Sequence, residues 1–414
     1  MSKGLENLRN VLREHGSTVS RIDQLGLEHN PFPMSGVVRS ENLPPVDEEA
    51  ADKVFSFIST TFANDVPGCL TIFGDYGSGK THLIKYCIRE ISKLASEMSN
   101  PPVALYVNNP GAAPKDLGHR IVQQIGEENM RKYLWSIIAR DVEELEDYLH
   151  ERKTLFAAEL GPDIIANYQE FRKCMTQSGR NFSSLKELFA KKLKDFVGDH
   201  DPGLTYRLSE FLFDESKTSN WDAIAGMSGS KEFEKKERIF LSTLVKILKD
   251  QGFSHVYVFV DEFEDVTSDL SKKARLYYMT TLRILTDVAN WSLVVAMNST
   301  ARQVIAEEKP PLLDRIAQWN VYLMPLAKPE AVRLISNYLK LAGFKGTVED
   351  FFADELIDRI LAVSKGNTRA FLTTLHKAVQ YAVQRGWQSP LDETLLDNMI
   401  ESGWIYIRGE ADGN

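Results

Sequence analysis

The sequence predicts an α/β protein with a five-stranded parallel sheet, a large helical insertion and a helical C-terminal region. Three observations lead to this class. Short apolar runs of strand length alternate with longer segments in which apolar residues recur at helical spacing. The first run is followed by the glycine-rich segment "GDYGSGKT" at residues 74–81. A later run, "VYVFV" at residues 256–260, ends in two acidic residues.

The composition is that of a folded protein and gives no sign of a membrane or secreted protein. The chain has 414 residues, of which 43% are hydrophobic and 26% charged, as in a folded protein with more than one domain. No apolar run reaches the roughly 18 residues of a membrane span. The N-terminus has no signal-peptide pattern, so we expect a cytoplasmic protein without a membrane partner. The net charge of −9 gives no overall attraction to nucleic acid, so any DNA contact would need a local basic patch.

The chain has three cysteines, Cys69, Cys87 and Cys174, without a CxxC pair or a cluster with histidine. This number and spacing suggest neither a disulfide framework nor a zinc site. We expect the three thiols to be reduced and mostly in the core.

In the first segment, residues 1–48, we expect a short amphipathic helix and a lead-in loop. The helix is predicted from "MSKGLENLRNVLREHG", and the loop contains "LGLEHNPFPMSG". This loop is similar to the lead-in of several prokaryotic ATPases, including transposon target-selection and secretion-associated proteins. A proline-rich loop that packs Phe32 on the core explains the same residues, and both interpretations stay open.

A nucleotide-binding core is predicted over residues 49–327, with strands at about 70–73, 103–107, 256–260, 292–297 and 321–324. After the first strand, glycines let the backbone N–H groups turn towards a phosphate, and the next helix adds a partial positive charge at its N-terminus. Lys80 would contact the β- and γ-phosphates of ATP, and the Thr81 hydroxyl would bind Mg²⁺. The candidate nucleotide-binding residues are Gly74, Asp75, Tyr76, Gly77, Ser78, Gly79, Lys80, Thr81 and His82.

A second part of the site is predicted where the apolar run at residues 256–260 ends. Asp261 would complete the protein ligands of Mg²⁺, and Glu262 would orient or deprotonate the attacking water. Alone, such a pair more often ends a strand and caps a helix, but the glycine loop earlier in the chain favours the catalytic interpretation. Glu264 and Asp265 are expected in a solvated turn.

With these two motifs the sequence resembles the AAA+ ATPases, and the resemblance implies further site residues. Asn298 follows the apolar run at residues 292–297 and would be sensor 1, which positions water near the γ-phosphate. An asparagine after a strand is otherwise a turn residue. Arg315 would be the arginine finger that reaches the nucleotide of a neighbouring subunit. Its alternatives are a surface ion pair with Asp314, or Arg302 as the finger.

Residues 328–414 are predicted to form a helical lid. Within "SKGNTRAF", Gly366 can end one helix and Asn367 can cap the next, which leaves Arg369 in an exposed first turn. This arrangement is similar to the sensor 2 arginine of the AAA+ lid, in the form found in origin-recognition initiator ATPases. Because few residues follow Trp404, we expect no winged-helix domain of the initiator type.

The segment between Lys80 and Asp261 is far longer than two βαβ crossovers require. We therefore predict a helical insertion at about residues 115–235, and expect it to contact a protein partner. This insertion, the "YVNNPG" after the second strand and the run at residues 256–300 also resemble ATP-binding components of BREX-like phage-defence systems.

The combined prediction is an ATP- and Mg²⁺-dependent AAA+ ATPase that forms a homo-oligomer with nucleotide at subunit interfaces. It would act on DNA, directly or through a DNA-bound complex, in defence, mobile-element or replication work. Basic helical faces are candidate DNA contacts, although such faces are usually solvated. They contain Lys191, Lys192, Lys194, Lys272, Lys273, Arg275 and Arg283. The alternatives are a nucleotide-gated signalling scaffold with negligible turnover and a P-loop small-molecule kinase.

Overall fold

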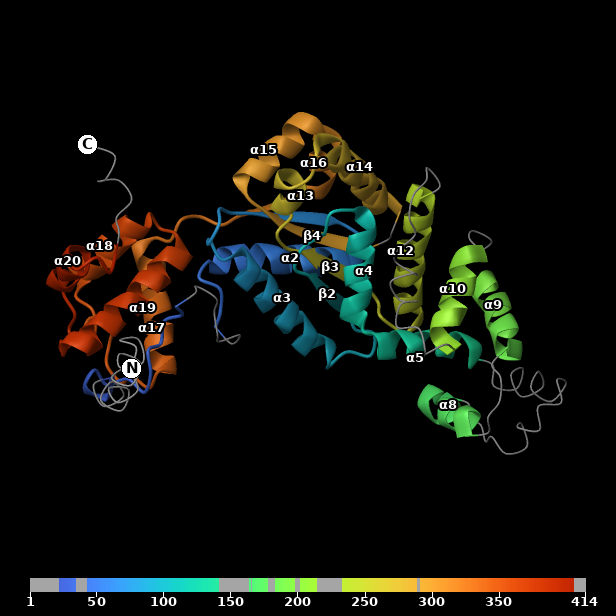
Figure 1. The fold of residues 1–414 in the computed structure, drawn as a ribbon, viewed down its shortest axis with the longest axis horizontal. Coiled ribbons are helices and arrows are strands. Elements are labelled where there is room, and N and C mark those ends of the chain that lie inside the picture. Colours follow the sequence, from blue (N-terminus) through green and yellow to red (C-terminus); the bar gives the residue numbers. More distant parts are fainter. Residues whose placement is uncertain are drawn as a thin grey trace, which may run out of the picture. The chain divides into compact units, whose positions relative to one another are not determined.

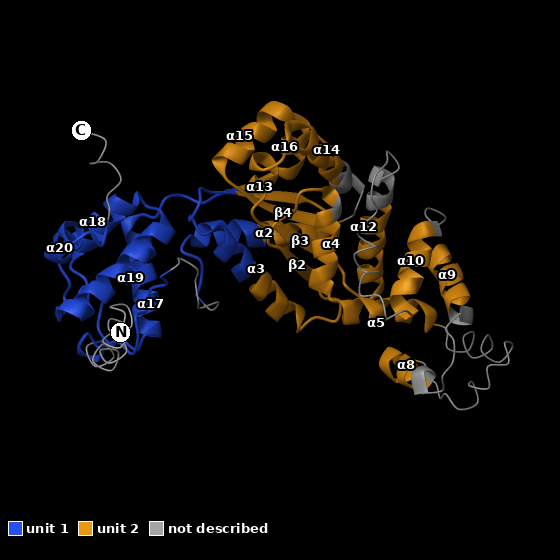
Figure 2. Ribbon diagram, in the orientation of Figure 1, with its two compact units in different colours: residues 1–55, 73–87, 321–414 blue, residues 56–72, 88–320 orange. Residues whose placement is uncertain are grey.

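The computed structural model describes residues 22–34, 43–140, 164, 166–177, 183–197, 202–213, 233–288 and 291–405. The predicted N-terminal helix and parts of the insertion lie outside the described residues. The chain divides into two units (Figure 2). Unit 1 comprises residues 1–55, 73–87 and 321–414, and unit 2 comprises residues 56–72 and 88–320.

A five-stranded parallel sheet confirms the predicted α/β class (Figure 1). The strand order is β2-β3-β4-β1-β5. The bounds are β1 (Cys69–Phe73), β2 (Val103–Val107), β3 (Val256–Val260), β4 (Ser292–Met297) and β5 (Trp319–Tyr322). Every residue of β3 and β4 is buried, as their continuous apolar sequences predict. β5 begins two residues earlier than predicted. The prediction missed this start because Trp319 and Asn320 are exposed and do not continue the apolar pattern.

Helices of unit 2 cover β2, β3 and β4. These strands are contacted in turn by α4 (Pro114–Ile125), α12 (Phe233–Asp250) and α16 (Pro310–Ile316). Around α16 lie α13 (Glu264–Ser268), α14 (Lys272–Val288) and α15 (Ser299–Glu308) (Figure 1). Two further helices, α2 (Glu48–Asn64) and α3 (Lys80–Ala95), have residues in both units. Among the described residues, none of the helices has the length and apolarity that a membrane crossing requires.

The insertion is helical, as predicted, and its described helices pack on one another. They are α5 (Glu127–Ile138), α8 (Tyr168–Gln177), α9 (Ser183–Val197) and α10 (Pro202–Phe213). The Trp135 ring stacks on Phe171 with centroids 4.4 Å apart, which joins α5 to α8. The buried Arg131 guanidinium lies 4.7 Å from the centroid of Phe211, which joins α5 to α10. Aromatic side chains thus join α5 to the other helices of the insertion.

The helical core of unit 1 is formed by α17 (Lys328–Leu341), α18 (Asp354–Ser364), α19 (Thr368–Arg385) and α20 (Glu393–Glu401), together with residues 22–34. Phe32 is buried, and its ring centroid lies 5.7 Å from that of Tyr338 and 5.9 Å from that of Phe352. Asn30 Nδ2 donates a hydrogen bond of 2.9 Å to the carbonyl of His376. The lead-in loop therefore packs on the C-terminal helices.

Candidate nucleotide-binding site

The glycine loop, residues 74–79, lies between the end of β1 and the start of α3. Gly77 and Gly79 have φ angles of 81° and 102°, a region that other residues rarely adopt. A Cβ on Gly77 would lie 2.6 Å from Asn367 Oδ1, and one on Gly74 would lie 2.4 Å from Ser78 Oγ. The loop therefore needs glycine both for its backbone and for its close neighbours.

Lys80, the first residue of α3, is only 7% exposed. Its Nζ donates hydrogen bonds to the carbonyl oxygens of Gly74 at 2.7 Å and Asp75 at 3.4 Å. Because these contacts already order the side chain, less conformational entropy is lost when a phosphate binds. The Ser78 hydroxyl oxygen is buried and has no hydrogen-bond partner among the described residues, which makes it a candidate donor to the same phosphate.

The other predicted residues of the loop differ in exposure. Asp75 and Tyr76 are exposed, and so is Thr81 in the first turn of α3, where its hydroxyl is accessible to a cation. His82 is half-buried, and its Nε2 lies 3.4 Å from the carbonyl oxygen of Pro44. The imidazole of His82 therefore contacts the segment before α2.

The start of α19 is attached to the glycine loop within unit 1. Asn367 caps α19, because its Oδ1 accepts a hydrogen bond of 3.0 Å from the Ala370 N–H. Its Nδ2 donates to the carbonyl of Tyr76, and the Arg369 N–H donates to the carbonyl of Gly77 at 3.1 Å. The Arg369 guanidinium lies 4.4 Å from the Tyr76 ring centroid. Arg369 is half-buried by this contact, whereas the sequence predicts an exposed residue.

The two predicted carboxylates follow β3 in unit 2. Asp261 is 1% exposed. Its carboxylate accepts a hydrogen bond of 2.9 Å from the Glu262 N–H and lies 3.1 Å from the Tyr106 hydroxyl, whose single proton is shared with Asn108 Oδ1 at 2.9 Å. Burial, and then the negative charge of Asp261, raise the pKa of the Tyr106 phenol, so Tyr106 remains a proton donor at neutral pH. A residue of β2 thus orients the buried carboxylate on β3.

Glu262 has a left-handed backbone conformation with a φ of 52°, which is rare for a residue with a side chain. The residues on both sides are fixed, because the Asp261 N–H donates to Val107 O at 2.8 Å and the Phe263 N–H donates to Ala296 O at 3.1 Å. The neighbouring strands therefore hold Glu262 in a conformation that costs on the order of 1–3 kcal/mol. Its side chain is exposed, and strain of this kind clusters at functional sites.

The next acidic residues correct a prediction. Glu264 and Asp265 are half-buried at the start of α13 rather than in a solvated turn. Asp265 accepts a hydrogen bond from Asn109 Nδ2, and Asn109 Oδ1 accepts one of 2.7 Å from the Gly111 N–H. Burial, and then the charge of Asp269, raise the pKa of the Asp265 carboxyl. The segment after β2 thus fixes the start of α13.

Asn298 lies between β4 and α15 and caps that helix. Its Oδ1 accepts a hydrogen bond of 2.8 Å from the Ala301 N–H, as the turn interpretation requires. The cap uses the side-chain oxygen, and the amide N–H₂ group of Asn298 supplies donors suited to water. Arg302 is exposed on α15, and Arg315 is exposed in the last turn of α16. Arg315 thus lies on the surface of unit 2, as an arginine that acts on another subunit must.

A magnesium ion that is bound mainly by nucleotide and water would need few protein ligands. Among the described residues, no group of three or more histidine, cysteine, aspartate or glutamate side chains is arranged to hold a metal ion. Mg²⁺ in nucleotide sites commonly takes one or two protein oxygens and completes its shell with phosphate and water. Unit 1 has an oxygen of this kind in the exposed Thr81 hydroxyl, and unit 2 has one in the Asp261 carboxylate.

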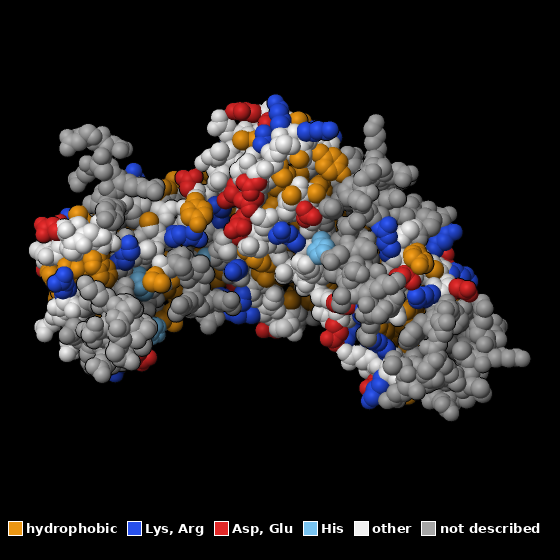
Figure 3. All heavy atoms as spheres, in the orientation of Figure 1, with side chains coloured by type: hydrophobic (Ala, Val, Ile, Leu, Met, Phe, Trp, Pro, Cys, Tyr) orange, Lys and Arg blue, Asp and Glu red, His pale blue; other side chains and the backbone are white. Residues whose placement is uncertain are grey.

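The predicted basic faces are mixed with acidic side chains. Arg275 donates from Nη2 and Nε to the Glu308 carboxylate at 2.6 and 2.7 Å, and from Nη1 to Thr267 O at 2.7 Å. Arg275 is therefore engaged within unit 2, while Lys272 and Lys273 are exposed on α14. Figure 3 shows basic and acidic side chains intermixed over the region of α14 and α15.

Two residues of these arrangements were not predicted from the sequence as site residues. Tyr106 lies 155 residues before Asp261, and the only local signal is a polar aromatic residue near the end of a strand. Asn367 was predicted as a helix cap, but its second contact, with Tyr76, spans 291 residues. The second donor of a capping asparagine is a signal that could have pointed to a further partner.

No family model and no curated protein matches this sequence. Three similar solved structures come from Aeropyrum pernix. The ORC1 protein in complex with DNA has 12% identity and a TM-score of 0.43, over 87% of this chain and 66% of that chain, slightly under two thirds of its length. The ORC2 protein in its ADP form has 14% identity and a TM-score of 0.43, over 87% of this chain and 69% of that one.

The third structure, the ORC2 protein with ADPNP and ADP, has 14% identity and a TM-score of 0.47, over 88% of this chain and 70% of that one. Similarities at this level carry no argument about function. The resemblance to BREX-like systems gains no support from the comparisons.

Proposed function

We propose that this chain is an AAA+ ATPase that binds and hydrolyses ATP with Mg²⁺ and switches an oligomer that acts on DNA or a DNA-bound complex. The observation that carries the proposal is the glycine loop, where two carbonyls hold the buried Lys80 and Arg369 lies beside Tyr76. A turn that matched the motif by chance would not require a buried ammonium group at its centre, because burying a charge is unfavourable without a partner.

In this proposal the loop N–H groups and Lys80 bind the phosphates, and Arg369 contacts the γ-phosphate. Mg²⁺, held by Thr81, Asp261 and the phosphates, would neutralise charge that develops during phosphoryl transfer. The carboxyl ends of parallel strands gather at one edge of a sheet. This rule supports a contribution to one reaction from the residues that follow β1, β3 and β4.

The water that attacks the γ-phosphate is assigned to Glu262 and Asn298. The exposed Glu262 carboxylate, held on a strained backbone, supports a role as general base. The Asn298 amide group would orient the same water. Arg315 of a neighbouring subunit would stabilise the charge on the transferred phosphoryl group.

The choice of target is assigned to surfaces outside the nucleotide site. Lys272 and Lys273 are exposed on α14, and an oligomer would present them repeatedly to DNA although each subunit is acidic. The insertion, whose described helices pack together around Trp135, would contact a protein partner. We assign this activity to the cytoplasm.

A nucleotide-gated scaffold with negligible turnover is the second candidate, and the large helical insertion, as a surface for protein partners, favours it. Light-scattering chromatography with ATP and Mg²⁺, with and without duplex DNA, separates the two when phosphate release is measured on the same samples. The ATPase proposal expects an oligomer that forms with nucleotide and releases phosphate faster with DNA. A monomer that binds ATP without turnover under every condition would favour the scaffold.

Mixed oligomers test the assignment of Arg315. Arg315→Ala and Glu262→Gln subunits should each be inactive, because each lacks one residue of every shared site. A mixture should regain activity where the Glu262 of the first pairs with the Arg315 of the second. The second mixture contains Arg302→Ala and Glu262→Gln subunits. If only this second mixture regains activity, Arg302 and not Arg315 is the arginine finger.

A further inference from the structure

Tyr76 places a large aromatic ring in the glycine loop, at a position where the backbone geometry requires no side chain of that kind. The residue is 73% exposed, so burial does not explain it. The described contacts of the ring and its hydroxyl group are instead with Arg369 of the lid. The ring is therefore best understood through what it does for that arginine.

The contact between the two side chains has two components. The guanidinium carbon of Arg369 lies 4.4 Å from the centroid of the Tyr76 ring, in cation–π geometry. Nη1 of Arg369 also donates a hydrogen bond to the phenol oxygen of Tyr76. The face contact restricts the position of the guanidinium, and the hydrogen bond restricts its rotation, so one side chain fixes both.

Backbone contacts keep the ring and the arginine in register. The Asn367 side chain donates to the carbonyl of Tyr76, and the Arg369 N–H donates to the carbonyl of Gly77 at 3.1 Å. A Cβ on Gly77 would lie 2.9 Å from the Arg369 Cβ, so the approach is as close as glycine allows. The start of α19 is thus attached to the residues that carry the ring.

We propose that Tyr76 is a positioning residue that orients Arg369 for the γ-phosphate, and so gives the site its preference for ATP over ADP. The inference rests on the proposed function, in which Arg369 contacts that phosphate. A guanidinium has five N–H donors, so it can keep one on the phenol while it donates others to phosphate oxygens. An arginine that is ordered before binding loses less conformational freedom on binding.

Titration calorimetry with two nucleotides tests this role in the full-length chain. The probes are ADP and the non-hydrolysable analogue β,γ-imido-ATP, each with Mg²⁺. Tyr76→Ala should lower the preference for the ATP analogue about three- to tenfold, and change ADP affinity less than about twofold. Tyr76→Phe should have a smaller effect, because it keeps the ring face and loses only the hydroxyl.

A double-mutant cycle and a matched control define the mechanism. Arg369→Ala should remove most of the preference for the ATP analogue, and adding Tyr76→Ala to it should change nothing further. Tyr206, on α10, is another exposed tyrosine, 62% exposed. Tyr206→Ala should leave both affinities unchanged.

Other results would overturn the inference in distinguishable ways. A higher affinity of Tyr76→Ala for the ATP analogue would mean that the tyrosine competes with phosphate for Arg369. An equal loss of both nucleotides would mean that Tyr76 only maintains the loop. If Arg369→Ala keeps the preference, the inference fails while ATP binding stands. If the unmodified chain binds neither nucleotide, the proposed function itself fails.

Discussion

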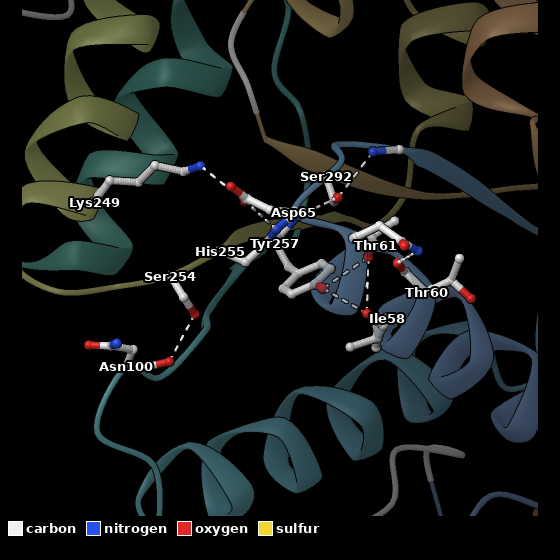
Figure 4. Close-up of polar contacts among 12 residues, drawn as sticks. Ile58, Thr60, Thr61, Asp65, Asn100, Lys249, Ser254, His255, Tyr257 and Ser292 are labelled. Atoms are coloured by element: carbon white, nitrogen blue, oxygen red, sulfur yellow. Dashed lines mark hydrogen bonds and ion pairs between the residues drawn. The ribbon is translucent and has the colours of Figure 1, made fainter.

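Polar side chains lie at both ends of β3. Those at the amino end are buried and hydrogen-bonded, whereas the carboxyl end includes an exposed carboxylate, Glu262. At the amino end, two groups of hydrogen bonds lie in the core of unit 2, and the His255 and Tyr257 rings, 4.5 Å apart between centroids, join them (Figure 4). The Tyr257 hydroxyl lies 2.9 Å from Thr61 Oγ1 and from the carbonyl oxygen of Ile58. His255 Nε2 lies 2.8 Å from Ser292 Oγ. We call Thr61, His255, Tyr257 and Ser292 the amino-end network.

At the carboxyl end, Asp261 is equally buried, but its neighbour Glu262 is exposed and its backbone is strained. In the amino-end network the hydroxyl groups and His255 Nε2 are buried and hydrogen-bonded, which suits a role in stability, while His255 Nδ1 has no hydrogen-bond partner among the described residues. The carboxyl end keeps one carboxylate oriented and another accessible, at a cost in backbone energy. Burial alone therefore does not distinguish the two ends of β3, whereas backbone strain and exposure do.

The largest expected effect tests whether the carboxyl end of β3 has a catalytic role. Glu262→Gln should lower the maximal rate of phosphate release at least about 100-fold, because it removes the proposed general base. The free energy of unfolding should change by less than about 0.5 kcal/mol, because the side chain is exposed. Phosphate release at saturating ATP and urea unfolding measure the two effects.

Two controls sharpen this test. Affinity for ATP should be retained in Glu262→Gln, since the phosphates are assigned to Lys80 and the loop. Glu264→Gln, in the half-buried residue at the start of α13, should keep turnover within a few-fold. Full activity of Glu262→Gln would contradict the proposed role of Glu262 as general base.

The second expected effect is a dependence of stability on pH at the amino end. Burial, and then the positive charge of Lys249, lower the pKa of His255 to about 4, against the opposing effect of Asp65. The unfolded chain, with a pKa near 6.5, therefore takes up a proton first as pH falls. The free energy of unfolding should be unaffected above pH 7 and fall by about 2.5 kcal/mol between pH 7.5 and pH 4.5.

Carboxylates elsewhere also titrate in this range, so the measured quantity is the difference from a variant. His255→Gln keeps a group that can bond to Ser292 and removes the titration. Urea unfolding at several pH values should show the loss in the unmodified chain and a smaller loss in His255→Gln. Equal pH dependence in both proteins would show that His255 is not held neutral by its surroundings.

The third effect concerns the hydroxyl that joins β4 to its neighbours. Ser292 Oγ accepts a hydrogen bond of 3.1 Å from the Gly68 N–H and contacts His255 Nε2. Ser292→Ala would leave both partners unsatisfied and should cost about 2 kcal/mol of stability without changing turnover. Ser254→Ala is the matched control, because it loses a single, solvent-exposed hydrogen bond to Asn100 O. It should lower the free energy of unfolding by less than Ser292→Ala does. A larger loss of stability in Ser254→Ala than in Ser292→Ala would contradict the stabilising role of the amino-end network.

The smallest effect is a gain at the carboxyl end. Glu262→Gly should raise the free energy of unfolding by up to about 1 kcal/mol, because glycine adopts a φ of 52° without strain. Turnover should be lost at the same time. Lys365, with the same φ of 52° after α18, is the comparison, because Lys365→Gly should stabilise the chain and keep turnover. A destabilised Glu262→Gly would show that the conformation at Glu262 carries no strain.

The sequence predicted the strands that are buried on both faces, because a strand such as Val256–Val260 is one continuous apolar run. It was less accurate for β5, where Trp319 is exposed and the apolar pattern ends. The glycine loop and the acidic pair were recognised because their residues are adjacent in sequence. Their geometry bears out the glycine requirement at Gly77 and adds the strain at Glu262.

The remaining contacts could not be predicted, because they join residues far apart in the chain. Tyr106 meets Asp261 only because β2 and β3 are neighbours in the sheet. Tyr76 meets Arg369 only because α19 starts against the loop. Whether Arg315 acts between subunits stays a prediction, because that contact involves another chain.

The packing of residues 22–34 on the C-terminal helices has a consequence for protein synthesis. Phe32 is buried against Tyr338, about 300 residues later in the chain, which a ribosome takes on the order of 15–60 s to add. During that time the apolar lead-in has been translated and its partner helices have not. Phe32 therefore cannot reach its native contacts until α17 has been translated, so this part of unit 1 can fold only late in synthesis.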